Sequence, residues 1–240
     1  MFAYKPISVG VLAIALQLII APVASAEKSA EFFHKQYEKL FRQFILAKAL
    51  PPAKPDLRRK HKIFFKRATQ YLREIPPEYA DYASGVHYFR GRLLLHCDYR
   101  EKAREDFERF LKLQAELAKE KEGEKGKDEE EAQSAPLPGM PSAELVKAFQ
   151  ACTYLPEKPD KFLTQIKDIP KNVLQVRERE FNKLFMSAVY EFETKAEHLD
   201  AAIKVLEVVK EFDLWDPDRD PNPQKLIEII RSRKRNLEAQ

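Results

Sequence analysis

Residues 84–115, SGVHYFRGRLLLHCDYREKAREDFERFLKLQA, decide the fold class of this chain. Large apolar residues recur every three or four positions on both sides of a break at 97–99, which is the pattern of two helices joined by a short turn. The same spacing continues on both sides of this stretch, with Pro at most of the breaks, and no segment alternates apolar and polar residues as a strand does. The sequence therefore predicts an all-α protein.

Glycine is scarce, and this argues against several classes of protein. The chain has 240 residues with 6 Gly and 16 Pro. Only Gly85 and Gly91 lie in segments with helical periodicity. Phosphate-binding loops of nucleotide-dependent enzymes and the nucleophile turn of many serine hydrolases require glycine at fixed positions. The composition therefore argues against such enzymes and against a turn-rich β-sandwich.

The quoted stretch resembles one tetratricopeptide repeat. The residues that carry the resemblance have the sizes that the family favours at these spacings, and they are Gly91, Leu94, Ala103 and Phe107. In that family a small residue of the first helix lets the second helix approach closely. The sequence departs from the family pattern, which favours Trp, a small residue and Pro, at His87, Phe110 and Ala115.

This resemblance implies antiparallel helical hairpins stacked as a short solenoid. It also implies a scaffold that offers a concave helical surface to a peptide or a subunit. The partner-binding residues that we expect on the hairpin surface are Tyr88, Arg92, Leu95 and Tyr99. An irregular helical domain without repeat symmetry is the alternative, because a single repeat cannot bury its own apolar face.

Residues 119–141 differ in composition from the rest of the chain. They are dense in Glu, Lys, Gly and Pro, and their only large apolar residues are Leu137 and Met140. Such a segment buries too little apolar surface to fold alone. The sequence therefore predicts a disordered charged linker between an N-terminal helical domain at 27–118 and a C-terminal one at 142–240.

The N-terminus has the pattern of a signal peptide over residues 1–26. Lys5 precedes an apolar run that ends at Ile20, and Ala24-Ser25-Ala26 fits the small-residue cleavage site. We therefore expect cleavage after Ala26 and a periplasmic or secreted protein, with an uncleaved membrane anchor as the alternative. Cleavage lowers the net charge from +4 to +3, because Lys5 is the only charged residue removed.

Export also bears on the two cysteines, Cys97 and Cys152. An oxidising compartment permits a disulfide between them, which would close a loop of 54 intervening residues. Two buried thiols that pack as small apolar groups are the alternative.

The strongest local charge lies between Lys54 and Arg73, where Asp56 is the only acid. Helical spacing places four cations on one side of this segment, namely Arg59, Lys62, Lys66 and Arg73. We expect this side to face an acidic subunit, anionic lipid headgroups or a cell-wall polymer, and a merely solvated helix face is the alternative. Nucleic acid is not expected outside the cytoplasm.

No catalytic constellation is present in the sequence. The adjacent residues His96, Cys97 and Asp98 lack a second ligand pair at metal-binding spacing, so neither a metal nor a cofactor is expected. The sequence predicts an exported, non-catalytic scaffold that binds a protein partner in the cell envelope. An accessory structural subunit of a larger envelope complex is the alternative. A helical enzyme acting on the cell wall is a third hypothesis, against which the missing motifs weigh.

Overall fold

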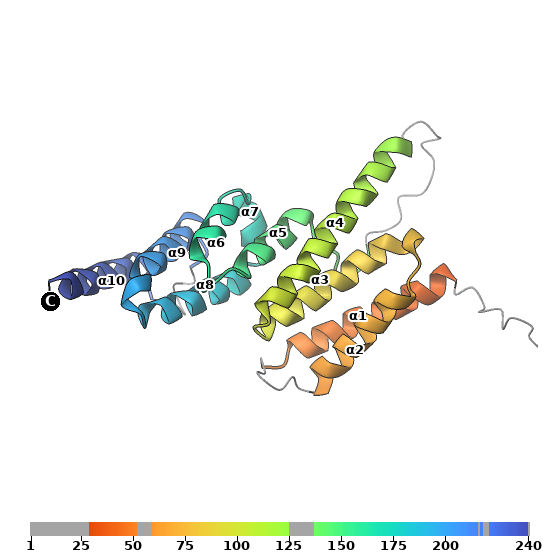
Figure 1. Cartoon of the computed structure of the whole chain (residues 1–240), viewed down its shortest axis with the longest axis horizontal. Coiled ribbons are helices and arrows are strands. Elements are labelled where there is room, and N and C mark those ends of the chain that lie inside the picture. The colour runs from red at the N-terminus through yellow and green to blue at the C-terminus, as the bar shows by residue number, and fades with distance from the viewer. Residues whose placement is uncertain (1–28, 52–58, 125–136, 216, 218–220, 240) are drawn as a thin grey trace, which may run out of the picture.

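The computed structural model describes residues 29–51, 59–124, 137–215, 217 and 221–239. Within this part of the chain every secondary-structure element is a helix, which confirms the predicted all-α class (Figure 1). In chain order the elements are α1 (Ala30–Lys48), α2 (Arg59–Glu74), η1 (Pro77–Tyr79), α3 (Ala80–His96), α4 (Arg100–Glu124), α5 (Ala143–Cys152), α6 (Pro159–Ile166), α7 (Lys171–Gln175), α8 (Glu178–Glu193), η2 (Ala196–His198), α9 (Leu199–Glu211) and α10 (Pro223–Glu238).

Local side chains start several of these helices, and aspartate ends two of them. The side chains of Ser29, Ser142 and Asn222 accept hydrogen bonds from the first-turn N–H groups of α1, α5 and α10. After α3 and α9 the chain turns at Asp98 and Asp213, whose φ angles are 62° and 55°. Glycine usually takes this left-handed position, and aspartate tolerates it better than most residues. A chain poor in glycine can therefore still end its helices sharply.

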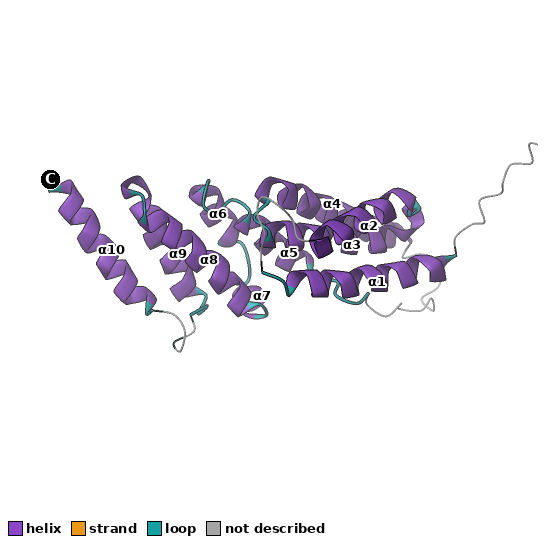
Figure 2. Cartoon of the chain, turned by 90° about the horizontal axis from the view of Figure 1, so that it is seen from below, coloured by secondary structure: helices purple, strands orange, loops and turns teal. Residues whose placement is uncertain are grey.

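The helices lie side by side in an elongated row (Figure 1; Figure 2). One end of the row is formed by α1 and α2, and the other end by α10. α3 packs against α1, α2 and α4, while α5 packs against α4 and α6. Further along, α9 packs against both α8 and α10. α3 is therefore the most enclosed helix of the N-terminal half.

One apolar core runs through both halves of the chain. The ring of Phe107 on α4 stacks with Phe149 on α5 at 6.4 Å between centroids, and Phe149 stacks with Phe181 on α8 at 4.6 Å. All three rings are fully buried. The predicted boundary between two helical domains is therefore not a division of the core.

The predicted linker at 119–141 is too long at both ends. α4 continues to Glu124, and residues 137–141 pack on the N-terminal half. There the Tyr37 hydroxyl donates to the carbonyl oxygen of Pro138 at 3.1 Å, and both Leu137 and Met140 pack against the core. These two apolar side chains anchor the end of the segment. Residues 125–136 lie outside the described part of the chain.

The predicted signal peptide, residues 1–26, also lies outside the described residues. Among the helices that the structure describes, none combines the length and the apolar character that a membrane span requires.

Candidate binding groove

The structure places most of the predicted partner-binding residues inside the molecule. Tyr88, Arg92 and Leu95 are only 4%, 3% and 6% exposed, and Tyr99 is half-buried. The prediction of an exposed hairpin surface is therefore wrong for the first three. The reason is clearest for Tyr88 and Arg92, because they contact α5 and α8, which cover this face of α3.

Arg92 holds the two halves together. Its guanidinium lies 3.5 Å from the ring centroid of Phe149 on α5 and donates hydrogen bonds to the Tyr88 hydroxyl at 2.6 Å and to the Glu180 carboxylate. Lys48 on α1 lies 2.5 Å from the same carboxylate of Glu180. A single acidic side chain from α8 thus forms ion pairs with cations from both α1 and α3.

The electrostatics of this cluster follow from its burial. Burial, with help from the nearby Arg92 charge, lowers the pKa of Lys48 to about 8, although Glu180 opposes the shift. Burial alone would raise the pKa of Glu180, but Arg92 and Lys48 outweigh it and hold that pKa below its ordinary value. Burial is also the main reason why the pKa of Tyr88 is raised. We call this cluster of Lys48, Tyr88, Arg92 and Glu180 the buried joint, because its contacts connect α1, α3 and α8.

The residues that carry the resemblance to a tetratricopeptide repeat are all buried, namely Gly91, Leu94, Ala103 and Phe107. A Cβ atom added at Gly91 would lie 2.6 Å from Cε1 of Phe107. Real Cβ contacts are longer than this, so α4 can approach α3 here because residue 91 has no side chain.

On another side of α3, a groove runs between α2 and α4. Its wider part has a volume of about 650 Å³, and a narrower part of about 410 Å³ continues from it past the shared residues Leu72, His87 and Arg109. α4 lines the groove from Lys102 to Glu120, a span of about 27 Å at 1.5 Å per helical residue. The apolar walls of the wider part come from Phe65, Leu72, Leu94 and Tyr99.

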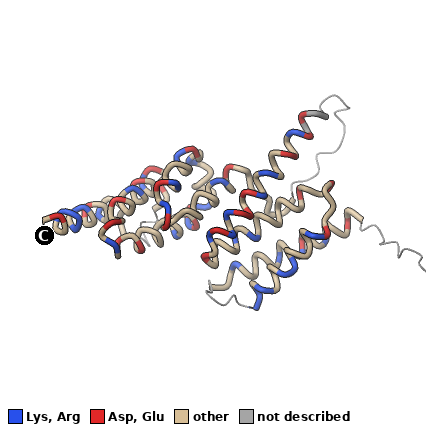
Figure 3. Tube along the Cα trace, in the orientation of Figure 1, with Lys and Arg blue, Asp and Glu red and all other residues tan. Residues whose placement is uncertain are grey.

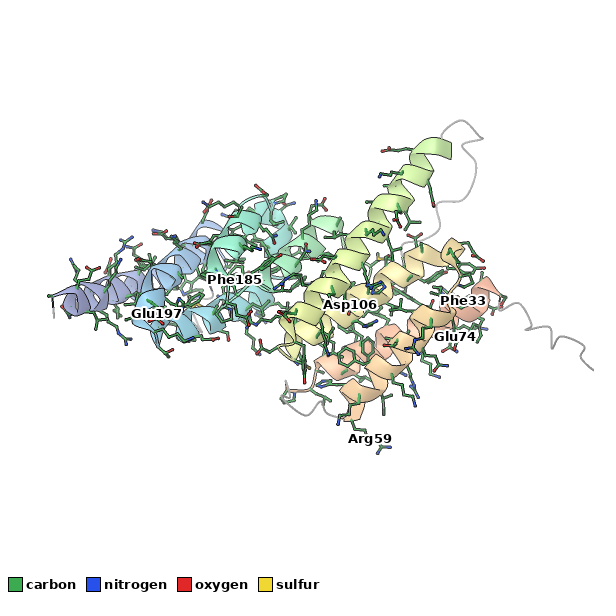
Figure 4. All side chains as sticks on the ribbon, viewed as in Figure 1. Phe33, Arg59, Glu74, Asp106, Phe185 and Glu197 are labelled. Atoms are coloured by element: carbon green, nitrogen blue, oxygen red, sulfur yellow. The ribbon has the colours of Figure 1, made fainter. Side chains whose placement is uncertain are left out.

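The floor of the groove holds a buried carboxylate, Asp106, between α3 and α4 (Figure 4). Asp106 is 3% exposed. Its Oδ1 lies 2.7 Å from Nδ1 of His87, and its Oδ2 lies 3.4 Å from Nε of Arg90. Because a carboxylate only accepts hydrogen bonds, Nδ1 of His87 carries the proton in this contact. Sequence reasoning missed this group, since His87 and Asp106 are 19 positions apart and match no motif.

The rim of the groove carries unbalanced charge. Arg73, Lys102 and Arg109 are exposed there, and none has an ion pair with any residue that the structure describes. Their acidic neighbour at this end is Glu105. At the far end the exposed acids are Glu116 and Glu120. The wider part of the groove is therefore cationic, whereas the narrower part carries both signs, because Arg109 and Lys112 line it beside the two acids.

The predicted basic face lies on α2, at the outer edge of the row. Lys and Arg positions follow one another along this helix (Figure 3), and Arg59 projects from its start away from the body (Figure 4). The four predicted cations are all exposed, namely Arg59, Lys62, Lys66 and Arg73. Arg73 alone of the four also lines the groove. Lys54 and Asp56 lie outside the described residues.

The two cysteines are buried, at 0% exposure for Cys97 and 1% for Cys152, and no disulfide joins them. Cys97 Sγ lies 3.6 Å from Nδ1 of His61, and burial raises the pKa of the Cys152 thiol. Of the two alternatives, the structure therefore has buried thiols. Across the described residues no cluster of three His, Cys, Asp or Glu side chains is arranged to hold a metal ion.

No protein-family model matches this chain, and neither a curated protein nor a solved structure shows significant similarity to it.

Proposed function

We propose that this protein is an exported, non-catalytic scaffold that holds a protein partner in the groove between α2 and α4. The observation that carries the proposal is the groove itself, about 27 Å long by the helical rise along α4, with apolar walls and charged ends. A binding site for a chain segment needs such length and such a mixture of apolar and polar groups. Export is proposed from the signal-peptide pattern that ends at Ala26.

The proposal includes a short tetratricopeptide-like solenoid. Its support is the close packing of Gly91 against Phe107, together with the order in which α3 packs on α1, α2 and α4. The binding surface differs from the one that the resemblance implies, because α5 and α8 cover Tyr88 and Arg92. We therefore assign the partner to the groove beside α2, with the basic face of that helix as an additional contact.

The experiment compares two Trp substitutions made on helices of the N-terminal half. Ala83→Trp fills the narrow part of the groove, and the matched control Ala115→Trp changes an exposed position of α4 that does not line the groove. Tagged chains are used to capture partners from an envelope extract, which are then identified by mass spectrometry. We expect the wild type and Ala115→Trp to retain the same partner and Ala83→Trp to lose it.

A second groove variant, Thr69→Trp, blocks the wide part from the α2 side. Thermal melting of each variant separates a blocked groove from a damaged fold. If a partner is retained equally by both folded groove variants, the assignment to the groove is wrong.

One observation favours the alternative function, an accessory subunit of a larger envelope complex. At the end of the row, α10 packs against α9 and exposes Ile229 and Leu237 at 62% and 42%. A terminal helix with exposed apolar residues is suited to a further subunit. The two functions differ in solution behaviour, since a scaffold is expected to be a soluble monomer, whereas a subunit without its companions is expected to aggregate unless Ile229→Lys removes the apolar contact.

A further inference from the structure

We infer that the occupant of the α2–α4 groove is an acidic peptide segment, bound with its carboxylates at Arg73, Arg90 and Arg109. This inference rests on the proposed function and names the chemistry of the partner. It also favours one orientation of the segment, because cations outnumber acids in the wider part of the groove but not in the narrower part.

Arg90 is the residue in the groove best prepared to bind an anion. Its Nε faces the buried Asp106 at 3.4 Å, and Asp106 is held in turn by His87 at 2.7 Å. The terminal Nη groups of Arg90 form no hydrogen bond with the described residues, and a quarter of its side chain (25%) is exposed. Nε of Arg90 and Oδ2 of Asp106 are both buried without a hydrogen-bond partner in the described part of the chain, so the guanidinium keeps its hydrogen-bonding capacity for a bound carboxylate.

Two more arginines face the same part of the groove from opposite walls. Arg73 belongs to α2 and Arg109 to α4, and neither has an ion pair within the described chain. Lys102 adds a third cation at the rim, where Glu105 is the exposed acid. Carboxylates placed between these walls would gain bidentate hydrogen bonds with less competition from water than on an open surface.

The far end of the groove lacks this excess of cations. Glu116 and Glu120 line it, and the nearby Lys112 is already paired with Glu116 at 3.8 Å. An acidic residue at that end would meet like charge, which disfavours the reversed placement of the segment. The two ends together therefore favour a segment whose acidic residues lie at one end.

The shape of the site favours a peptide over a lipid surface. Apolar side chains of Phe65, Leu72 and Leu94 line the groove beside the arginines. An extended chain of about eight residues, at about 3.3 Å each, fills a groove of about 27 Å. A membrane surface presents headgroups on a plane and cannot follow a groove between two helices. Exposed cations of α2 outside the groove, such as Lys66, could contact a membrane, but that contact would not involve the groove.

The test uses the full chain without its signal peptide and a fluorescein-labelled probe peptide. The probe has two Glu, then alternating Leu and Ser, then two Lys, and a second peptide replaces both Glu by Gln. Binding is followed by fluorescence anisotropy. We expect saturable binding of the acidic probe. The affinity for the Gln peptide should be lower by about fivefold or more, because Gln cannot form the charge-assisted hydrogen bonds that Glu forms with arginine.

Charge reversal in the protein locates the acidic end. The double variant Arg73→Glu/Arg109→Glu is expected to bind the acidic probe with an affinity lower by about tenfold or more. It should bind a peptide that carries Lys in place of Glu more tightly than the wild type does. The matched control Arg179→Glu/Lys225→Glu makes the same total charge change at exposed positions of α8 and α10. It should leave both affinities unchanged, and thermal melting should show that all variants are folded.

Three results would overturn the inference. The first is equal affinity for the acidic and Gln peptides, and the second is no saturable binding up to about 1 mM, the weak end of specific recognition. The third is binding to vesicles of phosphatidylserine and phosphatidylcholine that depends on Arg73 and Arg109 in the same way, which would make a lipid surface the occupant. The proposed scaffold function is decided separately, by the loss of the partner from Ala83→Trp.

Discussion

The Gly91→Ala variant gives the sharpest test of how α3 and α4 pack. The added methyl group would lie 2.6 Å from Cε1 and 2.8 Å from Cδ1 of Phe107. Phe107 is fully buried and stacks on Phe149, so its ring has little freedom to move away. The substitution therefore introduces overpacking at the closest approach of the two helices.

Two opposing terms set the size of the effect. Replacing Gly by Ala inside a helix favours the folded state by about 1 kcal/mol. Overpacking of a core costs about 1–3 kcal/mol, and the rigid surroundings of Phe107 place this case in the upper half of that range. We therefore expect a net loss of about 1–2 kcal/mol, which lowers the melting temperature by about 2–8 °C for a chain of this size.

Thermal and urea unfolding followed by circular dichroism measure this loss. Ala115→Gly, at an exposed position of α4, calibrates the helix-propensity term and should cost about 1 kcal/mol. Phe107→Leu removes the ring edge that the new methyl group meets, so the double variant should be less destabilised than the sum of the two single variants. Equal or greater stability of Gly91→Ala, or strict additivity with Phe107→Leu, would refute the close-packing argument.

Two further predictions concern the buried polar groups. Glu180→Gln leaves Arg92 buried without its counter-charge and should destabilise the protein by about 2–4 kcal/mol. Because the folded-state pKa of Glu180 is lowered, its ionised carboxylate stabilises the protein above pH 4.5, and this stabilisation is lost as the pH falls through the folded pKa. The free energy of unfolding, measured with urea, should therefore fall more for the wild type than for Glu180→Gln over this acidic interval. Cys97 and Cys152 should resist alkylation in the native protein, and each should add one alkyl group after unfolding without reductant; a chain that stays unmodified under those conditions would show a disulfide instead.

The fold class could be predicted because it depends on local signals. Apolar periodicity and Pro breaks determine where helices begin and end, and these are properties of neighbouring residues. The resemblance to a repeat also placed Gly91 opposite α4, where the structure has it against Phe107. Two aspartates at positive φ, Asp98 and Asp213, were not foreseen, because the same residue type is equally common in ordinary turns and caps.

The extent of the linker and the exposure of α3 could not be predicted, because both depend on distant contacts. Leu137 and Met140 look isolated in a charged segment, but they reach the core of the N-terminal half. Tyr88 and Arg92 have the composition of a binding surface, since aromatic residues and arginine are enriched at interfaces. In this protein the interface lies within the chain, and Glu180, 88 positions away, completes it.

The groove and the buried joint both follow from the enclosure of α3. This helix is buried over most of its circumference, so other elements cover it on most sides. α1, α2, α4 and the C-terminal half provide the cover. The residues of α3 that line the groove recur at helical spacing along one stripe, at positions 80, 83, 87, 90 and 94. His87 and Arg90 are the polar members of that stripe, and Asp106 of α4 forms a hydrogen bond with His87 and an ion pair with Arg90. His87 and Arg90 on the groove side of an enclosed helix are therefore the signal that locates the candidate site, and this signal can be recognised only when the neighbours of that helix are known.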